Sequence, residues 1–215
     1  MLKLYEKYRP HRLSQIVGQD RAVAQVGRLA KTGGFAGQAV WISGKSGQGK
    51  TTLGLCIAAG LADDLFVQQF DAGRLTPAAL QELDRSSHQL AWGKGGRVYI
   101  IEEAHGLRKD AVRALLVILE AAPEHVTWIF TTTVDGMSLF EDGIDAGPLL
   151  SRCIRIALTS QGLAQTFARL TSRIARREHL DGQDPAAYMV LANRERGNCR
   201  AMLQAIQDGG MKERN

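Results

Sequence analysis

Residues 39–62, AVWISGKSGQGKTTLGLCIAAGLA, contain a short apolar run, a glycine-rich turn and a longer apolar segment in succession. The run AVWIS at 39–43 is rich in strand-forming residues and predicts a buried strand. The segment 51–62 has the length and apolar character of a buried helix. This order of strand, loop and helix predicts a layered α/β domain with a parallel sheet.

The regions that follow this stretch continue the alternation. Strand-like runs occur at 98–101 and 126–131, and a helix-length segment at 109–122 separates them. After an apolar run at 154–158, the segments 161–179 and 185–207 carry helix-spaced apolar residues without a strand signal. We therefore expect an α/β domain with a mainly parallel central sheet over residues 1–158, followed by a small all-helical lid domain over residues 159–215. The connection 138–148 is expected to be a surface loop.

The composition excludes several classes of protein. With 215 residues, 45% apolar and 23% charged, the chain is long enough for one or two domains and is neither fibrous nor wholly disordered. Its net charge of +5 permits a polyanionic partner but does not demand one. The three cysteines are far apart, which excludes a disulfide framework, and no apolar run approaches the roughly 18 residues of a membrane span. We expect a cytoplasmic protein with no membrane partner.

The glycine-rich turn carries the strongest functional signal. Residues 44–51, GKSGQGKT, match the phosphate-loop pattern G-x-x-x-x-G-K-[ST] at every fixed position, between a predicted strand and a predicted helix. Glycines let backbone N–H groups approach phosphate oxygens, Lys50 is placed to reach the β- and γ-phosphates, and the Thr51 hydroxyl can hold Mg²⁺. We therefore expect ATP and Mg²⁺ as ligands, with nucleotide-binding residues Gly44, Ser46, Gly47, Gln48, Gly49, Lys50, Thr51 and Thr52.

Two carboxylates follow the predicted strand at 98–101, where α/β sheets place their ligand chemistry. Glu102 is expected to hold the metal shell together with Thr51, and Glu103 to orient or deprotonate the attacking water. The usual residue at the first position is Asp, so the longer Glu102 leads us to expect slow hydrolysis. Thr133, with Thr132 as a rival, is expected to hydrogen-bond the γ-phosphate or the attacking water.

Four separated motifs resemble those of AAA+ clamp-loader ATPases, of the DNA polymerase III tau/gamma or replication factor C small-subunit type. The first is the opening YEKYRP at 5–10 with IVGQD at 16–20, and the second is the block EEAH at 102–105 with ALL and LE at 114–120. The first motif resembles the segment that wraps the adenine base in that family, which implies base-binding roles for Tyr8, Arg9, Pro10, Val17 and Gly18. No His or Cys lies at ligand spacing from His105, so we expect it to be a hydrogen-bonded residue and not a metal ligand.

The other two motifs each carry an arginine. Ser151-Arg152-Cys153 is similar to the family's arginine-finger motif, which implies that Arg152 offsets transition-state charge at a neighbouring subunit's nucleotide. The stretch GNCRAML at 197–203 resembles the sensor-2 motif, which implies that Arg200 touches the nucleotide from the lid.

The resemblance as a whole implies an AAA+ P-loop ATPase that works in a homo- or hetero-oligomer of AAA+ subunits and loads a sliding clamp onto primer-template DNA. It also implies a C-terminal collar domain in full-length subunits, which these 215 residues do not contain. The cysteine cluster of bacterial-type loaders is absent from the sequence, so no zinc is expected. Candidate DNA-facing residues are Lys94, Arg97, Arg108 and Lys109. Two alternatives stay open: a related DNA motor of the branch-migration type, and a weakly hydrolysing ATP-dependent scaffold.

Overall fold

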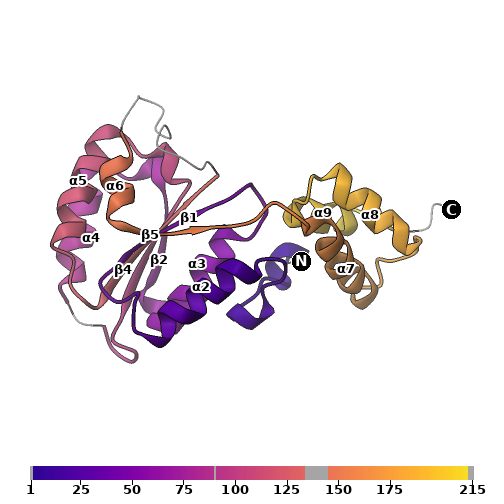
Figure 1. Cartoon of the computed structure of the whole chain (residues 1–215), viewed down its shortest axis with the longest axis horizontal. Coiled ribbons are helices and arrows are strands. Elements are labelled where there is room, and N and C mark those ends of the chain that lie inside the picture. Colours follow the sequence, from indigo (N-terminus) through magenta and orange to yellow (C-terminus); the bar gives the residue numbers. More distant parts are fainter. Residues whose placement is uncertain (1, 90, 134–144, 213–215) are drawn as a thin grey trace.

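The computed structural model describes residues 2–89, 91–133 and 145–212, which form an α/β domain and a helical lid (Figure 1). Within these residues the central sheet has the strand order β2-β3-β4-β1-β5, and all neighbouring strands pair in parallel. The strands are β1 (Ala39–Ser43), β2 (Val67–Asp71), β3 (Arg97–Glu102), β4 (Val126–Thr132) and β5 (Cys153–Ala157). Their carboxyl ends therefore meet at one edge of the sheet, the edge at which α/β folds bind ligands.

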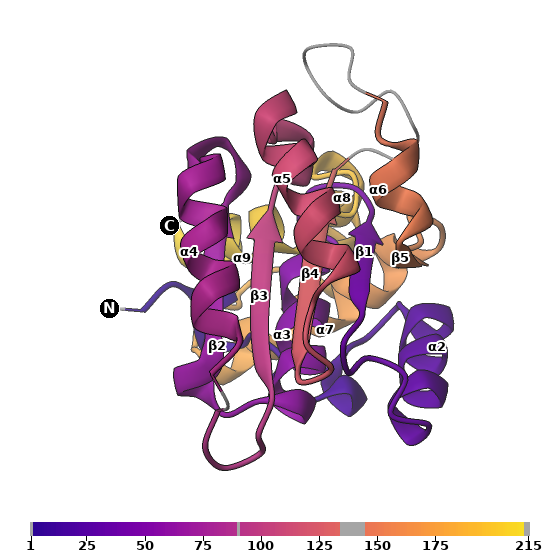
Figure 2. The same cartoon turned by 90° about the vertical axis from the view of Figure 1, so that its left-hand side faces the viewer.

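Helices cover both faces of the sheet (Figure 2). Along β3, Tyr99 and Ile101 pack into the hydrophobic cluster under one set of helices, whereas Val98 and Ile100 pack into the cluster on the other face. This alternation follows from the period of two along a strand. The first set is α4 (Pro77–Ser87), α5 (Lys109–Glu120) and α6 (Gly147–Ser151), and the second is α2 (Asp20–Lys31) and α3 (Lys50–Leu61). The predicted parallel α/β fold is confirmed.

Several elements escaped the sequence prediction, among them β2, α2 and α4. Strand β2 lies at the edge of the sheet, and its residues Gln68 and Gln69 are exposed, so it has no apolar run to announce it. Helix α4 begins after Thr76, whose side chain accepts a hydrogen bond from the Ala79 amide, and Pro77 stands at its first position. This helix start is readable in the sequence once capping chemistry is considered.

The lid contains α7 (Leu163–Arg177), α8 (Pro185–Arg194) and α9 (Cys199–Gln207). The predicted helix at 161–179 is α7, but the segment 185–207 forms two helices because Arg196 and Gly197 both have positive φ and interrupt it. The expected domain boundary at 158/159 falls in the connection between β5 and α7. Helix α1 (Leu4–Lys7) packs on the lid, since Leu4 is 4% exposed and lies in the lid's hydrophobic cluster.

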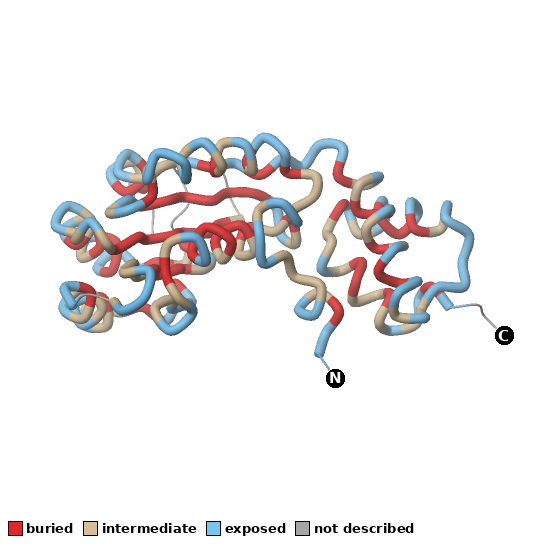
Figure 3. The backbone as a smooth tube through the Cα atoms, turned by 90° about the horizontal axis from the view of Figure 1, so that it is seen from below, coloured by how far each residue is buried: buried red, intermediate tan, exposed pale blue. Residues whose placement is uncertain are grey.

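The buried residues lie along the strands and on the inner sides of the helices, as Figure 3 shows. Among the described residues no helix has the length and apolar character needed to cross a membrane. Most of the expected surface loop at 138–148 lies outside the described residues, and its last two residues, Gly147 and Pro148, begin α6.

Candidate nucleotide-binding site

The turn between β1 and α3 spans residues 44–49 and lies at the carboxyl edge of the sheet. Gly47 and Gly49 have φ of 74° and 100°, a backbone region that favours glycine. Gly44 is needed for a different reason, because a Cβ on it would lie 2.8 Å from the Leu158 Cβ. A tight turn of this kind before a helix N-terminus collects backbone N–H groups around an anion.

Lys50 is the first residue of α3 and is buried. Its ammonium group donates hydrogen bonds to the carbonyls of Gly44 at 3.0 Å and Lys45 at 3.2 Å, so the side chain folds back over the loop. Burial lowers the pKa of Lys50, and the carboxylates of Glu103 and Glu102 oppose this shift. The charge of Lys50 is thus held inside the turn, where anionic phosphate oxygens would solvate it.

The two acidic residues stand at the end of β3. Glu103 has a positive φ of 52°, and its carboxylate accepts a 3.5 Å hydrogen bond from the Thr133 hydroxyl. His105 Nδ1 lies 3.5 Å from the same carboxylate oxygen and 3.3 Å from the Thr132 hydroxyl on β4. The ends of two neighbouring strands therefore share one polar cluster, and His105 has the hydrogen-bonded role expected for it.

A cavity of about 420 Å³ lies between the phosphate loop, the N-terminal segment and the lid. The predicted site residues that line it are Tyr8, Arg9, Pro10, Val17, Ser46, Gly47, Gln48, Gly49, Lys50, Thr51, Thr52, Glu102, Glu103 and Arg200. Its size is within the usual range for a small-molecule site. Thr51 and Glu102 bring hydroxyl and carboxylate oxygens to one cavity, and this is the hard donor set that suits Mg²⁺.

Four predicted residues are not among the cavity's lining residues: Gly18, Gly44, Thr133 and Arg152. Thr133 contacts the cavity through Glu103, and Gly18 packs on the lid, because a Cβ there would lie 2.8 Å from Leu163 Cδ2. Sequence reasoning missed other lining residues, namely Tyr5, Lys7, His11, Gln15, Ile16, Phe167, Leu170, Ile174, Cys199 and Leu203. The helical spacing of those on α7 predicts a buried face but not what that face meets.

The N-terminal segment connects the lid to this cavity. The Tyr8 hydroxyl and the Lys7 ammonium both donate hydrogen bonds to the Glu178 carboxylate at the end of α7. These bonds, that of Lys7 first, lower the pKa of Glu178. The Arg200 guanidinium lies over the Tyr5 ring, 5.5 Å from its centroid. Residues near the expected base-binding segment are thus held by the lid.

The connection from β5 to α7 is fixed at two points. The Gln19 side chain forms two hydrogen bonds with the Thr159 backbone, at 3.1 and 2.9 Å. Gln48 in the phosphate loop donates to the Ser160 hydroxyl at 3.0 Å and accepts from the Lys45 amide at 2.9 Å. The loop and the root of the lid therefore share hydrogen bonds.

Arg152 lies far from the phosphate loop of its own chain. Ala39, at the start of β1, pairs with Cys153, and Ser43, at the end of β1, pairs with Ala157. Arg152 therefore precedes the amino end of the strands, whereas the loop follows their carboxyl end, about 20 Å away along the strands. Its guanidinium donates to the Pro148 carbonyl at 2.8 Å and forms an ion pair with Glu120.

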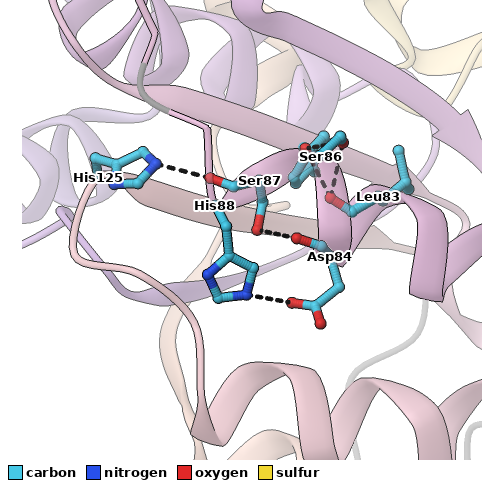
Figure 4. A network of polar contacts seen from close by, with 7 residues as sticks. Leu83, Asp84, Ser86, Ser87, His88 and His125 are labelled. Atoms are coloured by element: carbon cyan, nitrogen blue, oxygen red, sulfur yellow. Dashed lines mark hydrogen bonds and ion pairs between the residues drawn. The ribbon is translucent and has the colours of Figure 1, made fainter.

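A group of Ser, His and Asp residues lies at the end of α4 (Figure 4). The Ser87 hydroxyl donates to the Asp84 carbonyl at 2.6 Å, and His125 Nε2 lies 2.7 Å from the Ser87 carbonyl. The serine hydroxyl thus bonds the backbone and not an imidazole, so this is no nucleophile and base pair. The group ties the end of α4 to the start of β4.

No family model matches the chain. It is 28% identical to the DNA polymerase III subunit tau of Escherichia coli strain K12, over 96% of this chain and 35% of that protein. It is 27% identical to the replication factor C small subunit of Methanoregula boonei, over 94% of this chain and 61% of that protein. The chain therefore spans about a third of the tau subunit and less than two thirds of the replication factor C subunit.

Among solved structures, a Thermotoga maritima RuvB Holliday junction branch migration motor has the same fold. Its TM-score is 0.69 at 23% identity, over 93% of this chain and 64% of that chain. The chain thus has the fold of AAA+ proteins, and over nearly its whole length its sequence is similar to those of clamp-loader subunits.

Proposed function

We propose that this chain binds and hydrolyses ATP as one subunit of a clamp-loader-like AAA+ complex that places a sliding clamp on primer-template DNA. The observation that carries the proposal is the meeting of Lys50, Thr51, Glu102 and Glu103 in one cavity that the lid also lines. The relatedness to tau and replication factor C subunits supports the assignment to clamp loading. A cytoplasmic location is part of the proposal.

The charged and hydroxyl-bearing residues around the phosphate loop divide the tasks of phosphoryl transfer. The loop N–H groups and Lys50 bind the β- and γ-phosphates, and Thr51 and Glu102 would hold Mg²⁺, which neutralises developing charge between the phosphates. Glu103 orients the attacking water, while Thr133 and His105 fix the direction of its carboxylate. Arg200 reaches the same cavity from the lid, so the nucleotide would contact both domains.

Arg152 completes the reaction only from a neighbouring subunit, because its own phosphate loop is at the other edge of the sheet. A guanidinium supplied in this way offsets charge on the transferred phosphoryl group. The active unit is therefore a homo- or hetero-oligomer in this proposal.

The candidate DNA-facing residues fall into two groups. Arg108 and Lys109 are exposed at the start of α5. Lys94 and Arg97 lie before β3 and have local partners, since Lys94 donates to the Ala59 carbonyl at 2.6 Å and Arg97 lies over the Phe66 ring at 5.3 Å. We propose that Arg108 and Lys109 contact the phosphates of the DNA backbone. DNA binding through these residues would weaken with added salt.

The two alternatives receive less support. A branch-migration motor shares the fold, but that likeness, at 20–23% identity, is one of fold alone. The argument for a weakly hydrolysing scaffold is the presence of Glu102 in place of Asp. Glu102 nevertheless lines the cavity, which is the place expected for an Asp at this position.

The test is ATP turnover with and without primed DNA and a sliding clamp. Lys50→Ala is expected to lower turnover about 100-fold or more, because it removes a charge that stabilises the transition state. Lys45→Ala, an exposed lysine of the same loop, is the matched control and should keep the parent's turnover. Glu103→Gln should bind ATP normally and hydrolyse it slowly. An ATP turnover rate that does not change when primed DNA and clamp are added would contradict the clamp-loading assignment.

A further inference from the structure

We propose that Glu120 is a positioning residue for the arginine finger: it holds the Arg152 guanidinium in a fixed orientation for the nucleotide of the neighbouring subunit. The inference rests on the proposed function, in which Arg152 acts in a neighbour's site. Glu120 is the last residue of α5, and Arg152 follows the last residue of α6. The two side chains come from different elements and meet at the amino edge of the sheet.

The guanidinium is fixed by two hydrogen bonds that leave most of it available. One amino group donates to the Pro148 carbonyl at 2.8 Å, and the other donates to the Glu120 carboxylate. A guanidinium has five N–H groups, so three have no partner among the described residues. The Arg152 side chain is 35% exposed, so these donors remain open to an anion from outside the chain.

Without Glu120 the arginine would have room to move. Both residues line a cavity of about 220 Å³, together with Leu119, Ala122 and Trp128. The backbone carbonyl of Pro148 alone bonds one corner of the guanidinium and does not fix the plane of the group. The carboxylate supplies the second point that fixes the plane.

The charge of the carboxylate does not conflict with this role. Glu120 is 61% exposed, so water weakens its attraction for the arginine. A triphosphate carries more negative charge than one carboxylate and would bind the remaining donors. Glu120 therefore restricts the orientations of Arg152 before the neighbour arrives, which lowers the entropy lost when the finger docks.

A subunit-mixing experiment tests this with the whole chain. The acceptor chain carries Arg152→Ala, and the donor chain carries Lys50→Ala, so hydrolysis in the mixture comes from acceptor sites that face donor fingers. Turnover in the mixture above that of either chain alone would support the finger in trans. Turnover no higher than that of either chain alone would overturn both the finger's role and this inference.

Glu120→Ala is then added to one chain at a time. In the donor it should lower the turnover number of the mixture about 2- to 10-fold, the range expected when a flexible side chain must be ordered on docking, with the KM for ATP unchanged. In the acceptor it should change nothing, because that chain's finger is already absent. Glu120→Gln in the donor keeps a hydrogen-bond acceptor and should restore much of the turnover.

Two controls exclude a loss of structure. Glu82→Ala in the donor removes another exposed glutamate, one paired with Arg85 at 3.1 Å, and should leave turnover unchanged. Thermal melting should show the same midpoint for Glu120→Ala and the parent donor. If the mixture is active but Glu120→Ala in the donor leaves turnover unchanged or raises it, the positioning role is overturned while the proposed function stands.

Discussion

Gly47 is one of the points at which the phosphate loop lies against the lid. A Cβ placed on Gly47 would lie 1.8 Å from Asn198 Oδ1 and 2.3 Å from Asn198 Cγ. Asn198 is the N-cap of α9, and its Oδ1 accepts a hydrogen bond from the Ala201 amide at 3.1 Å. In Gly47→Ala the asparagine must therefore leave its cap position or the loop must move away from it.

The cost has two parts. An alanine at φ of 74° loses about 1–2 kcal/mol relative to glycine, and the displaced cap loses about 1 kcal/mol. We expect the free energy of unfolding of Gly47→Ala to fall by about 2–3 kcal/mol, and its melting midpoint to fall by about 5–10 °C. The lid would also be held less closely to the loop, so affinity for ATP should fall.

A double-mutant cycle measured by urea unfolding separates the two parts. Asn198→Ala removes the cap and should cost about 1 kcal/mol alone. The double variant should cost no more than Gly47→Ala, because the cap is lost only once, so the cycle should give a coupling of about 1 kcal/mol. Gly60→Ala is the control, since nothing lies within 4 Å of a Cβ at that helical position, and it should be neutral or stabilising. Additive costs for the two single variants would refute the contact.

Two further predictions concern the lid and the thiols. Glu178→Ala should release Lys7 and Tyr8 from the end of α7, seen as faster proteolysis near Tyr8, whereas Glu195→Ala should not. Because hydrogen bonds from Lys7 and Tyr8 lower the pKa of Glu178 from its ordinary 4.5, the same release should begin in the parent only as the pH falls below that value. Loss of solvation raises the pKa of Cys56 to about 11 and those of the half-buried Cys153 and Cys199 to about 12, so iodoacetamide at pH 8 should modify them at least about 50-fold more slowly than a free thiol; an ordinary rate would contradict the raised pKa values.

The local chemistry of the site could be predicted from the sequence. The spacing of the glycines, Lys50 and Thr51 places them between a strand and a helix, and each of those elements has an apolar pattern that identifies it. Glu102 ends a strand that is buried on both faces and Glu103 follows it, so their position at the same edge as the phosphate loop follows from parallel pairing. These are consequences of short-range order, which a single sequence carries.

The contacts across the site could not be predicted. The bond between Tyr8 and Glu178 joins segments from opposite ends of the chain, and neither residue has a local pattern that points to the other. Gly47 also has a second reason to be glycine, the nearness of Asn198, which no turn rule contains. Such pairs depend on how the N-terminal segment and the lid meet the α/β domain in three dimensions, and no local pattern of residues encodes that arrangement.

The nucleotide site and Arg152 lie at opposite edges of the sheet, and their positions restrict how subunits can assemble in the proposed function. Lys50 and Glu103 serve the nucleotide at the carboxyl edge of the sheet, and Arg152 stands at the amino edge. A contact that brings Arg152 of one chain to the phosphate loop of another must join the amino edge of one sheet to the carboxyl edge of the next. Where this contact joins unlike faces head to tail, it repeats until it closes into a ring or continues as a filament. In an open assembly, one terminal site would lack a finger and would hydrolyse ATP more slowly than the others.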